Sequence, residues 1–206
     1  MASDFLFRLV FSLLWVVFLG IFAWCAHSIN RAAGRRTTRY AKHLRAIALV
    51  FAGLYLAGSL LYALLPSSVA FLSIPLPDSI RLGMVGLGVV GTAFVLWGLA
   101  SLGKNWAPSL SGLRTDTVLI TTGAYRLVRH PIYLGAFIFL AAQALLAANL
   151  LTLVPTVALL TLLYAQLPEE ESMLIDRFGD EYREYMKRTP RFMPSFKNEP
   201  KRTEKD

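Results

Sequence analysis

The sequence predicts an all-α integral membrane protein with about five transmembrane helices and a C-terminal amphipathic helix on the cytoplasmic side. Of the 206 residues, 55% are hydrophobic, and the mean hydropathy is +0.51. Uncharged runs recur along the chain, each as long as the roughly 20 residues that a helix needs to cross a bilayer. We expect helices in these runs because a helix satisfies its own backbone groups in lipid.

Three predicted spans lie in the N-terminal half of the chain, over Phe5–Asn30, Ala46–Leu65 and Leu82–Leu102. The first carries a single charge, Arg8, near its start. We interpret it as a membrane span and not as a signal peptide, because its apolar stretch is too long and no basic segment precedes it. The connection 66–80 contains three prolines and cannot form a continuous helix.

The uncharged stretch 131–167 is too long for one crossing. At 1.5 Å per residue its 37 residues would form a helix of roughly 55 Å, so we expect a hairpin of two helices with its tip at Asn149. Pro131 suits the first turn of the first helix, where its missing N–H costs nothing. The same proline keeps the preceding residue out of helical geometry, so Arg129 and His130 are expected in a non-helical elbow.

The C-terminal segment 169–189 is predicted to be an amphipathic helix that starts after Pro168. Its apolar residues recur every three to four positions and form one stripe, made of Leu174, Phe178, Tyr182 and Tyr185. We expect this stripe to lie against the cytoplasmic ends of the bundle.

The chain therefore divides into two predicted units. Residues 1–100 hold the first three transmembrane helices. Residues 101–195 hold a loop, the helical hairpin and the C-terminal helix, and residues 196–206 are a predicted disordered tail.

Positive charge is concentrated in segment 31–45, which contains six Lys or Arg residues and no acid. By the positive-inside rule this loop is cytoplasmic. Five spans then place the N-terminus outside, and the loop 103–130 and the C-terminus inside. Topology and contact with anionic lipid explain the charge. We do not expect nucleic-acid binding, because no basic-aromatic module accompanies it.

The run Gly86-Leu87-Gly88-Val89-Val90-Gly91 matches the dinucleotide-binding fingerprint letter for letter. It lies inside an uncharged span, whereas the fingerprint works only at a strand-to-helix turn. We interpret Gly83, Gly88 and Gly91 as positions of close helix packing. The three histidines and the single cysteine share no ligand spacing, so no metal site is predicted.

Two polar clusters at the ends of predicted spans carry the candidate site. One is the elbow with Arg129 and His130, and the other is the run 169–171 of three glutamates. Snorkelling, an aromatic belt and the helix dipole could explain each group separately. Both clusters, however, fall on one membrane face, and the open ends of the hairpin bring them together. Charged groups at membrane spans are costly to keep without a function.

Such a pocket suits a zwitterionic cofactor that carries an aromatic ring. Its carboxylate would be held by Arg or by amides at a helix N-terminus. Its sulfonium would be held by Glu or by aromatic faces, and its ribose hydroxyls by Glu or His. S-adenosylmethionine combines all these parts.

The motifs around these clusters resemble the isoprenylcysteine carboxyl methyltransferase family and its bacterial relatives. The resemblance covers roughly residues 100–195 and rests on 119–125, 129–135, Glu169-Glu170 and 178–185. It implies an integral membrane enzyme that uses S-adenosylmethionine without a Rossmann domain. The partners it implies are the lipid bilayer and a lipophilic small-molecule or prenylated substrate.

The resemblance also implies the cofactor-binding residues, which are Leu119, Ile120, Tyr125, His130, Pro131, Ile132, Tyr133, Glu169 and Glu170. The predicted catalytic residues are Arg129, which anchors the cofactor carboxylate or the substrate, and Glu170, a candidate base for a neutral acceptor. Gln166 stands where the carboxyl methyltransferases carry an Arg that meets the substrate carboxylate. This departure favours a neutral or different lipophilic acceptor.

Three other functions stay open. A phospholipid N-methyltransferase or a sterol-type NADPH reductase would share a related core. The reductase needs a clamp for a 2′-phosphate, and the only dense basic cluster, in 31–45, is better explained by topology. A non-enzymatic small membrane protein, such as a transporter, predicts charged or broken positions in mid-span. The spans are uncharged at their centres, which counts against it.

Overall fold

The computed structural model describes residues 2–29, 42–105 and 118–193. The regular secondary structure of these residues is helical, and short turns, connections and one isolated bridge, between Ser73 and Asn149, lie between the helices. The helices are α1 (Ala2–Ile29), α2 (Lys42–Leu64), α3 (Pro66–Val69), α4 (Asp78–Leu102), α5 (Pro131–Ala147), α6 (Leu150–Phe178) and α7 (Asp180–Arg188). Three 3-10 turns accompany them within the described ranges, η1 (Ala70–Leu72), η2 (Gly103–Asn105) and η4 (Gly123–Arg126). The predicted all-α class is confirmed.

Four described helices, α1, α2, α4 and α6, are long and apolar enough to cross a membrane. The remaining predicted span, the fourth along the chain, is α5, an apolar helix of 17 residues. Large apolar side chains such as Trp24, Leu60 and Val89 are exposed on the outer faces of the long helices. Lipid covers such side chains in integral membrane proteins. The long apolar helices agree with this class of protein for the chain.

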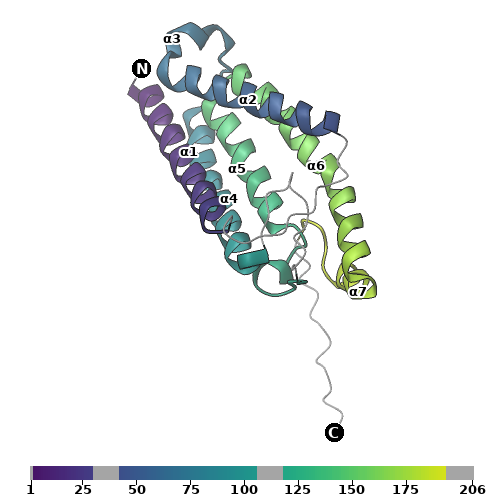
Figure 1. The fold of residues 1–206 in the computed structure, drawn as a ribbon. Helices are drawn as coiled ribbons and strands as arrows, with labels where there is room; N and C mark the ends of the chain where they lie inside the picture. The colour runs from purple at the N-terminus through teal and green to yellow at the C-terminus, as the bar shows by residue number, and fades with distance from the viewer. Residues whose placement is uncertain (1, 30–41, 106–117, 194–206) are drawn as a thin grey trace.

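Helices α1, α4 and α5 lie side by side, and α6 lies on the side of α5 away from α1 (Figure 1). The N-terminus and α3 lie at one end of the bundle, whereas η4 and α7 lie at the other. Helix α2 crosses α6 near the start of α6. A Cβ added to Gly58 of α2 would come within 2.8 Å of the Leu151 carbonyl oxygen of α6.

The backbones of α4 and α5 touch through glycines. A Cβ at Gly91 would lie 2.6 Å from the Phe139 backbone nitrogen, and one at Gly135 would lie 2.6 Å from the Gly91 carbonyl oxygen. A Cβ at Gly88 would lie 3.2 Å from Leu14 Cδ1 of α1. The packing role predicted for Gly88 and Gly91 is confirmed. It is wrong for Gly83, whose Cβ would meet no described atom within 4 Å, because this glycine faces outward.

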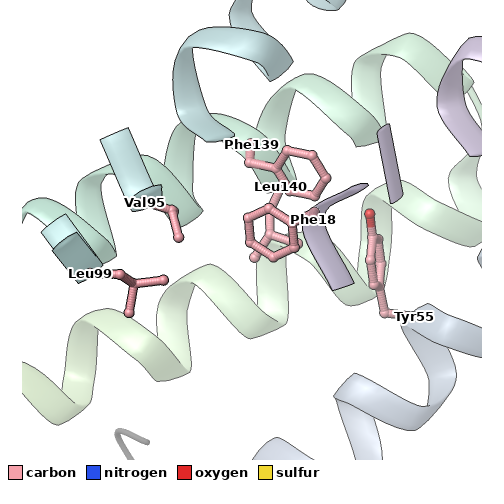
Figure 2. Close-up of a cluster of buried hydrophobic side chains, with 6 residues drawn as sticks. All are labelled: Phe18, Tyr55, Val95, Leu99, Phe139 and Leu140. Carbon is pink, nitrogen blue, oxygen red and sulfur yellow. The ribbon is translucent and has the colours of Figure 1, made fainter. Parts of the chain in front are cut away.

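An aromatic core joins α1 to the α4–α5 pair (Figure 2). The rings of Phe18 in α1 and Phe139 in α5 are stacked, with centroids 3.9 Å apart and planes 5° apart. Val95 of α4 and Phe139 are completely buried. This packing fixes the start of α5, and therefore the elbow before it, relative to the rest of the bundle.

The α5–α6 hairpin turns at Asn149, as the sequence predicts. The Asn149 side chain accepts a hydrogen bond from the Leu151 backbone at 2.9 Å and donates one to the Val69 carbonyl at 2.9 Å. Ala148, just before it, takes a left-handed conformation with φ 48°. The hairpin therefore returns the second half of α6 to the end where α5 begins.

The predicted helix start at Pro168 is wrong. Helix α6 continues through Pro168 to Phe178 and ends at Gly179, where φ is 58°. Pro168 lies on the exposed face of the helix, so the carbonyl that loses its donor is not trapped in the core. A left-handed glycine ends the helix instead, and the predicted segment 169–189 is split between α6 and α7.

Three sequence features lie wholly or partly outside the described residues. They are the basic segment 31–45 up to residue 41, part of the loop 103–130, and the tail 196–206. The division of the chain at residue 100 stays a prediction.

The contact between α4 and α5 predicts that alanine substitutions at two glycines of α4 will have different effects on the free energy of unfolding. Gly91→Ala should lower the free energy of unfolding by about 1–3 kcal/mol, because the added methyl group must push the α5 backbone away. Gly86 has open space around it. Gly86→Ala should therefore leave stability unchanged or raise it by up to about 1 kcal/mol. Thermal unfolding of detergent-purified protein measures both, and equal effects would contradict the close approach.

Candidate active site

The elbow before α5 is held by the segment that follows α7. The backbone nitrogen of Arg129 donates to the Pro190 carbonyl at 2.9 Å, and that of His130 donates to the Arg191 carbonyl at 3.3 Å. His130 has φ −126° and ψ 62°, so the predicted non-helical elbow is confirmed. The elbow and the C-terminal segment therefore form one unit, although about 60 residues separate them in sequence.

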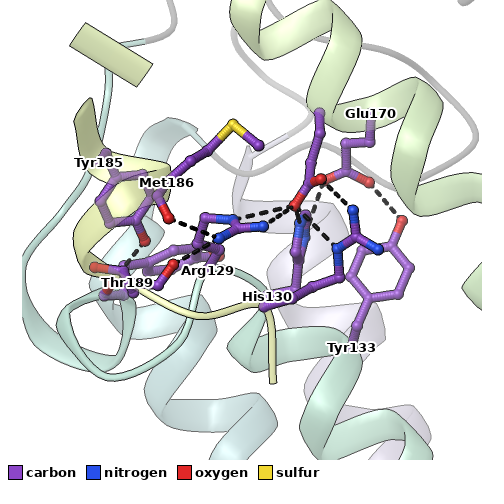
Figure 3. Close-up of polar contacts among 10 residues, drawn as sticks. Arg129, His130, Tyr133, Glu170, Tyr185, Met186 and Thr189 are labelled. Carbon is purple, nitrogen blue, oxygen red and sulfur yellow. Dashed lines mark hydrogen bonds and ion pairs between the residues drawn. The ribbon is translucent and has the colours of Figure 1, made fainter. Parts of the chain in front are cut away.

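The carboxylate of Glu171 is the centre of the polar cluster, part of which is labelled in Figure 3. Glu171 is 4% exposed. Its Oε1 accepts hydrogen bonds from Arg129 Nε at 3.1 Å and Nη2 at 2.8 Å, and lies 3.1 Å from His130 Nε2. Arg191 donates to both carboxylate oxygens. Two guanidinium groups and one imidazole thus surround a single buried carboxylate.

Arg129 also caps the end of α7. Its Nη1 donates to the Thr189 carbonyl at 2.6 Å and the Met186 carbonyl at 3.3 Å (Figure 3). A cation at a helix C-terminus interacts favourably with the helix dipole as well as with the free carbonyls. Nε, Nη1 and Nη2 of Arg129 therefore all bond to groups of the protein itself.

Glu170 is the more accessible carboxylate of the cluster. Its side chain is 23% exposed, against 5% for Glu171. Oε2 accepts a hydrogen bond of 2.5 Å from the Tyr133 hydroxyl, and Oε1 lies 3.9 Å from His130 Nδ1 (Figure 3). His130 thus lies between the two carboxylates, with one ring nitrogen toward each.

Aromatic rings line one side of the cluster. The ring of Phe192 lies 5.3 Å from that of Phe137 and 6.3 Å from those of His130 and Tyr164, measured between centroids. A groove of about 580 Å³ between α5 and α6 adjoins this wall. Its lining is almost entirely apolar and consists of Phe137, Ile138, Ala141, Leu160, Thr161 and Tyr164.

Three pKa values are raised in this arrangement. The neighbouring Glu171 carboxylate raises the pKa of Arg191 above its usual value. Burial raises the pKa of Tyr185, so its hydroxyl stays protonated and donates to the Tyr125 carbonyl at 2.6 Å. Burial likewise raises the pKa of Tyr125.

The structure brings four of the predicted site residues together, namely Arg129, His130, Tyr133 and Glu170. Sequence reasoning placed Glu171 in the cluster of three glutamates but gave it no individual role, and it gave none to Arg191. With α6 continuous through Pro168, Glu171 stands four residues after the buried Leu167 and shares its inward face. The helical period would have identified Glu171 had the helix been extended through the proline.

The other predicted residues lie around this cluster. Ile132 packs against α4, where a Cβ at Gly98 would approach its Cγ1 to 2.7 Å, and Pro131 contacts the same glycine. Leu119 and Ile120 are half-buried before η4. Glu169 is half-buried and makes no hydrogen bond or ion pair with another residue that the structure describes. Cofactor contact at these positions stays a prediction.

Comparison with known proteins adds to this geometry. The model of the isoprenylcysteine carboxyl methyltransferase family matches residues 84–176, from α4 to the last turn of α6. Over this region, a little under half of its length, the chain is similar to that family.

Individual relatives are similar to a part of the chain. Protein-S-isoprenylcysteine O-methyltransferase of Schizosaccharomyces pombe is 39% identical over 98 residues, which is 47% of this chain and 42% of that protein. Methanethiol S-methyltransferase 1 of Bradyrhizobium diazoefficiens is 42% identical over 71 residues, which is 34% of this chain and 24% of that protein.

The solved structure of the eukaryotic intramembrane Ras methyltransferase ICMT superimposes with a TM-score of 0.51 at 20% identity. The match covers 76% of this chain and 53% of that one, and it shows a shared fold. The chain thus spans about half the length, or less, of these proteins.

The cluster predicts unequal effects for two neighbouring glutamates. Glu171→Gln should destabilise the protein by about 3–5 kcal/mol, because it leaves the nearly buried Arg129 guanidinium without its counter-ion. Glu169→Gln changes the same chemistry on the same helix and should cost less than about 0.5 kcal/mol. Thermal unfolding in detergent measures both. A Glu171→Gln variant as stable as Glu169→Gln would show that the cluster does not hold the elbow.

Proposed function

We propose that the protein is an integral membrane methyltransferase that transfers a methyl group from S-adenosylmethionine to a lipophilic acceptor. The observation that carries the proposal is the accessible Glu170 carboxylate, bonded to Tyr133 and next to His130, beside an apolar groove. The family match over residues 84–176 supports the reaction class. No described feature favours one of the other functions that the sequence left open.

The residues present fit the proposed cofactor. Glu170 offers a carboxylate to hydroxyl or ammonium groups. The rings of Tyr133 and Phe192 offer faces for a sulfonium. Arg191, whose side chain is 31% exposed, is the cation of the cluster that is most open to a carboxylate. When bound, S-adenosylmethionine supplies the electrophilic methyl group.

The contacts of Arg129 favour a positioning role over the predicted catalytic one. Its three guanidinium nitrogens are bonded to Glu171 and to the end of α7, and its side chain is 9% exposed. We infer that Arg129 fixes the elbow and that Arg191 replaces it as the residue that anchors a carboxylate.

Glu170 and His130 are the candidates for proton transfer. A carboxylate or thiolate acceptor needs no base, whereas a neutral thiol, amine or alcohol does. Tyr133 donates to Glu170 and holds the carboxylate in place. The aromatic wall keeps water from the reacting groups, which strengthens the electrostatic interactions within the site.

The α5–α6 groove is the proposed route for the acceptor from the bilayer. Its apolar lining matches an alkyl or prenyl chain, and its wall shares Phe137 and Tyr164 with the aromatic side of the cluster. Gln166 is buried and uncharged, which favours a neutral acceptor over a prenylcysteine carboxylate. A methanethiol S-methyltransferase among the similar proteins is consistent with a thiol acceptor.

We also propose that the active site and the C-terminus face the cytoplasm and the N-terminus lies outside. The basic residues of segment 31–45, together with those of 103–130, support this orientation through the positive-inside rule. The cofactor would then enter from the cytosol.

Ligand binding separates the proposed function from the reductase alternative. Calorimetry on detergent-purified protein should show binding of S-adenosylmethionine and S-adenosylhomocysteine but not of NADPH. His130→Ala and Glu170→Ala should abolish this binding without unfolding the protein, because they remove groups that contact the cofactor. Arg183→Gln, on the exposed face of α7, is the control and should bind as the wild type does.

Binding of NADPH alone would indicate a reductase. Binding of none of the three ligands, S-adenosylmethionine, S-adenosylhomocysteine and NADPH, would favour a non-enzymatic function. Unchanged affinity in the His130 or Glu170 variant would remove that residue from the site.

The groove predicts a selective effect on long acceptors. Ala141→Trp should raise KM by roughly tenfold for a thiol with a prenyl or long alkyl chain, because the indole fills the groove. The KM for methanethiol, which does not need the groove, should change little. Ala165→Trp, at an exposed position of α6 outside the groove, is the matched control. Equal KM changes for short and long acceptors would place the route elsewhere.

A further inference from the structure

A second cavity, of about 860 Å³, lies at the end of the bundle opposite the candidate active site. It is formed by the starts of α1 and α4, the end of α2, the 66–76 connection and the α5–α6 turn. These elements lie at the end of the bundle that holds the N-terminus and α3 in Figure 1, whereas η4 and α7 lie at the far end. The cavity is therefore separate from the polar cluster around Glu171.

The wall of this cavity contains a buried arginine, Arg81, each of whose three guanidinium nitrogens donates a hydrogen bond. Arg81 donates to the Asp4 carboxylate at 2.9 Å, to the Tyr62 hydroxyl at 3.2 Å and to the Leu146 carbonyl at 3.0 Å. Its guanidinium carbon lies 4.1 Å from the centre of the Phe7 ring. These contacts join α1, α2, α4 and α5, and they leave Asp4 and Arg81 neutralising each other.

Two further charged residues line the cavity, Arg8 and Asp78. Arg8 donates from Nε to the Asp4 carbonyl at 3.2 Å, and its Nη atoms form no hydrogen bond with the residues that the structure describes. Asp78, in the first turn of α4, forms no ion pair with any of those residues. With Arg81 and Asp4 paired, the cavity thus offers one cation and one anion to a ligand.

The surroundings of the cavity are those of a lipid interface. The cavity lies where the apolar helices α1, α2 and α4 begin or end. Beside it, Phe71 is 81% exposed, and Leu64 and Leu65 are also exposed. A cavity with charged residues in a partly apolar wall, next to exposed apolar side chains, matches a molecule with a charged headgroup and hydrocarbon chains.

We propose that this cavity binds the zwitterionic headgroup of a phospholipid, in the leaflet opposite the active site. The Arg8 guanidinium pairs with the phosphate and the Asp78 carboxylate pairs with the ammonium group, as in phosphatidylethanolamine. Ser67 and Ser73, which also line the cavity, supply hydroxyls to the phosphate oxygens. The volume lies within the range of small-molecule sites, about 300–1,000 Å³.

Lipid retention tests the proposal on the full chain. The protein is reconstituted in nanodiscs of equal parts phosphatidylethanolamine and phosphatidylglycerol, then released for native mass spectrometry. The wild type should retain one phosphatidylethanolamine in preference to phosphatidylglycerol. Arg8→Gln and Asp78→Asn should each reduce this preference by about tenfold, because each removes one charge-assisted contact to the headgroup.

Arg183→Gln, at the other end of the bundle, is the matched control and should keep the wild-type preference. Soluble phosphoethanolamine is tested in parallel and should not displace the lipid at equal concentration, because it lacks the chains that the apolar rim contacts. Absence of a preference in the wild type, a preference for phosphatidylglycerol, displacement by phosphoethanolamine, or variants that retain lipid as the wild type does would each overturn the proposal. Binding of S-adenosylmethionine should be the same in all these variants.

Discussion

The buried carboxylate of Glu171 is the interaction on which the site depends. A carboxylate removed from water is costly unless donors surround it. Here the donors come from two directions, Arg129 and His130 in the elbow and Arg191 after α7. Satisfying this one anion therefore requires α6, the elbow and the C-terminal segment to meet. Glu170 and Tyr133, the groups proposed to act in catalysis, are positioned as a consequence.

The close packing of α4 and α5 supplies the rigid support for this cluster. Because glycines replace side chains at the contact, the two backbones touch and α5 cannot rotate or slide freely. The stacked Phe18 and Phe139 rings attach α1 to the same pair. Pro131 starts α5 directly after the elbow, so the position of His130 follows from helix packing many residues away.

Much of this architecture could be predicted from the sequence, and the misses have physical causes. The hairpin tip at Asn149 and the elbow at His130 depend on local chemistry, a side-chain cap and a proline, and were predicted correctly. The path of α6 was not, because a proline on an exposed helix face is tolerated. That error hid the inward position of Glu171. Arg191 joins the cluster through contacts across about 60 residues, which no local pattern reveals.

Arg129 and Arg81 are buried near opposite ends of the bundle, and each is bonded to a carboxylate and to backbone carbonyls. We infer that these arginines form the walls of the two sites and that other groups bind the ligands. A structure of the protein with S-adenosylhomocysteine tests this most directly. The account predicts that the ligand contacts Glu170, His130 and Tyr133 while Arg129 stays bonded to Glu171. A ligand carboxylate bonded to Arg129 in place of Glu171, or a ligand bound away from the elbow, would contradict it.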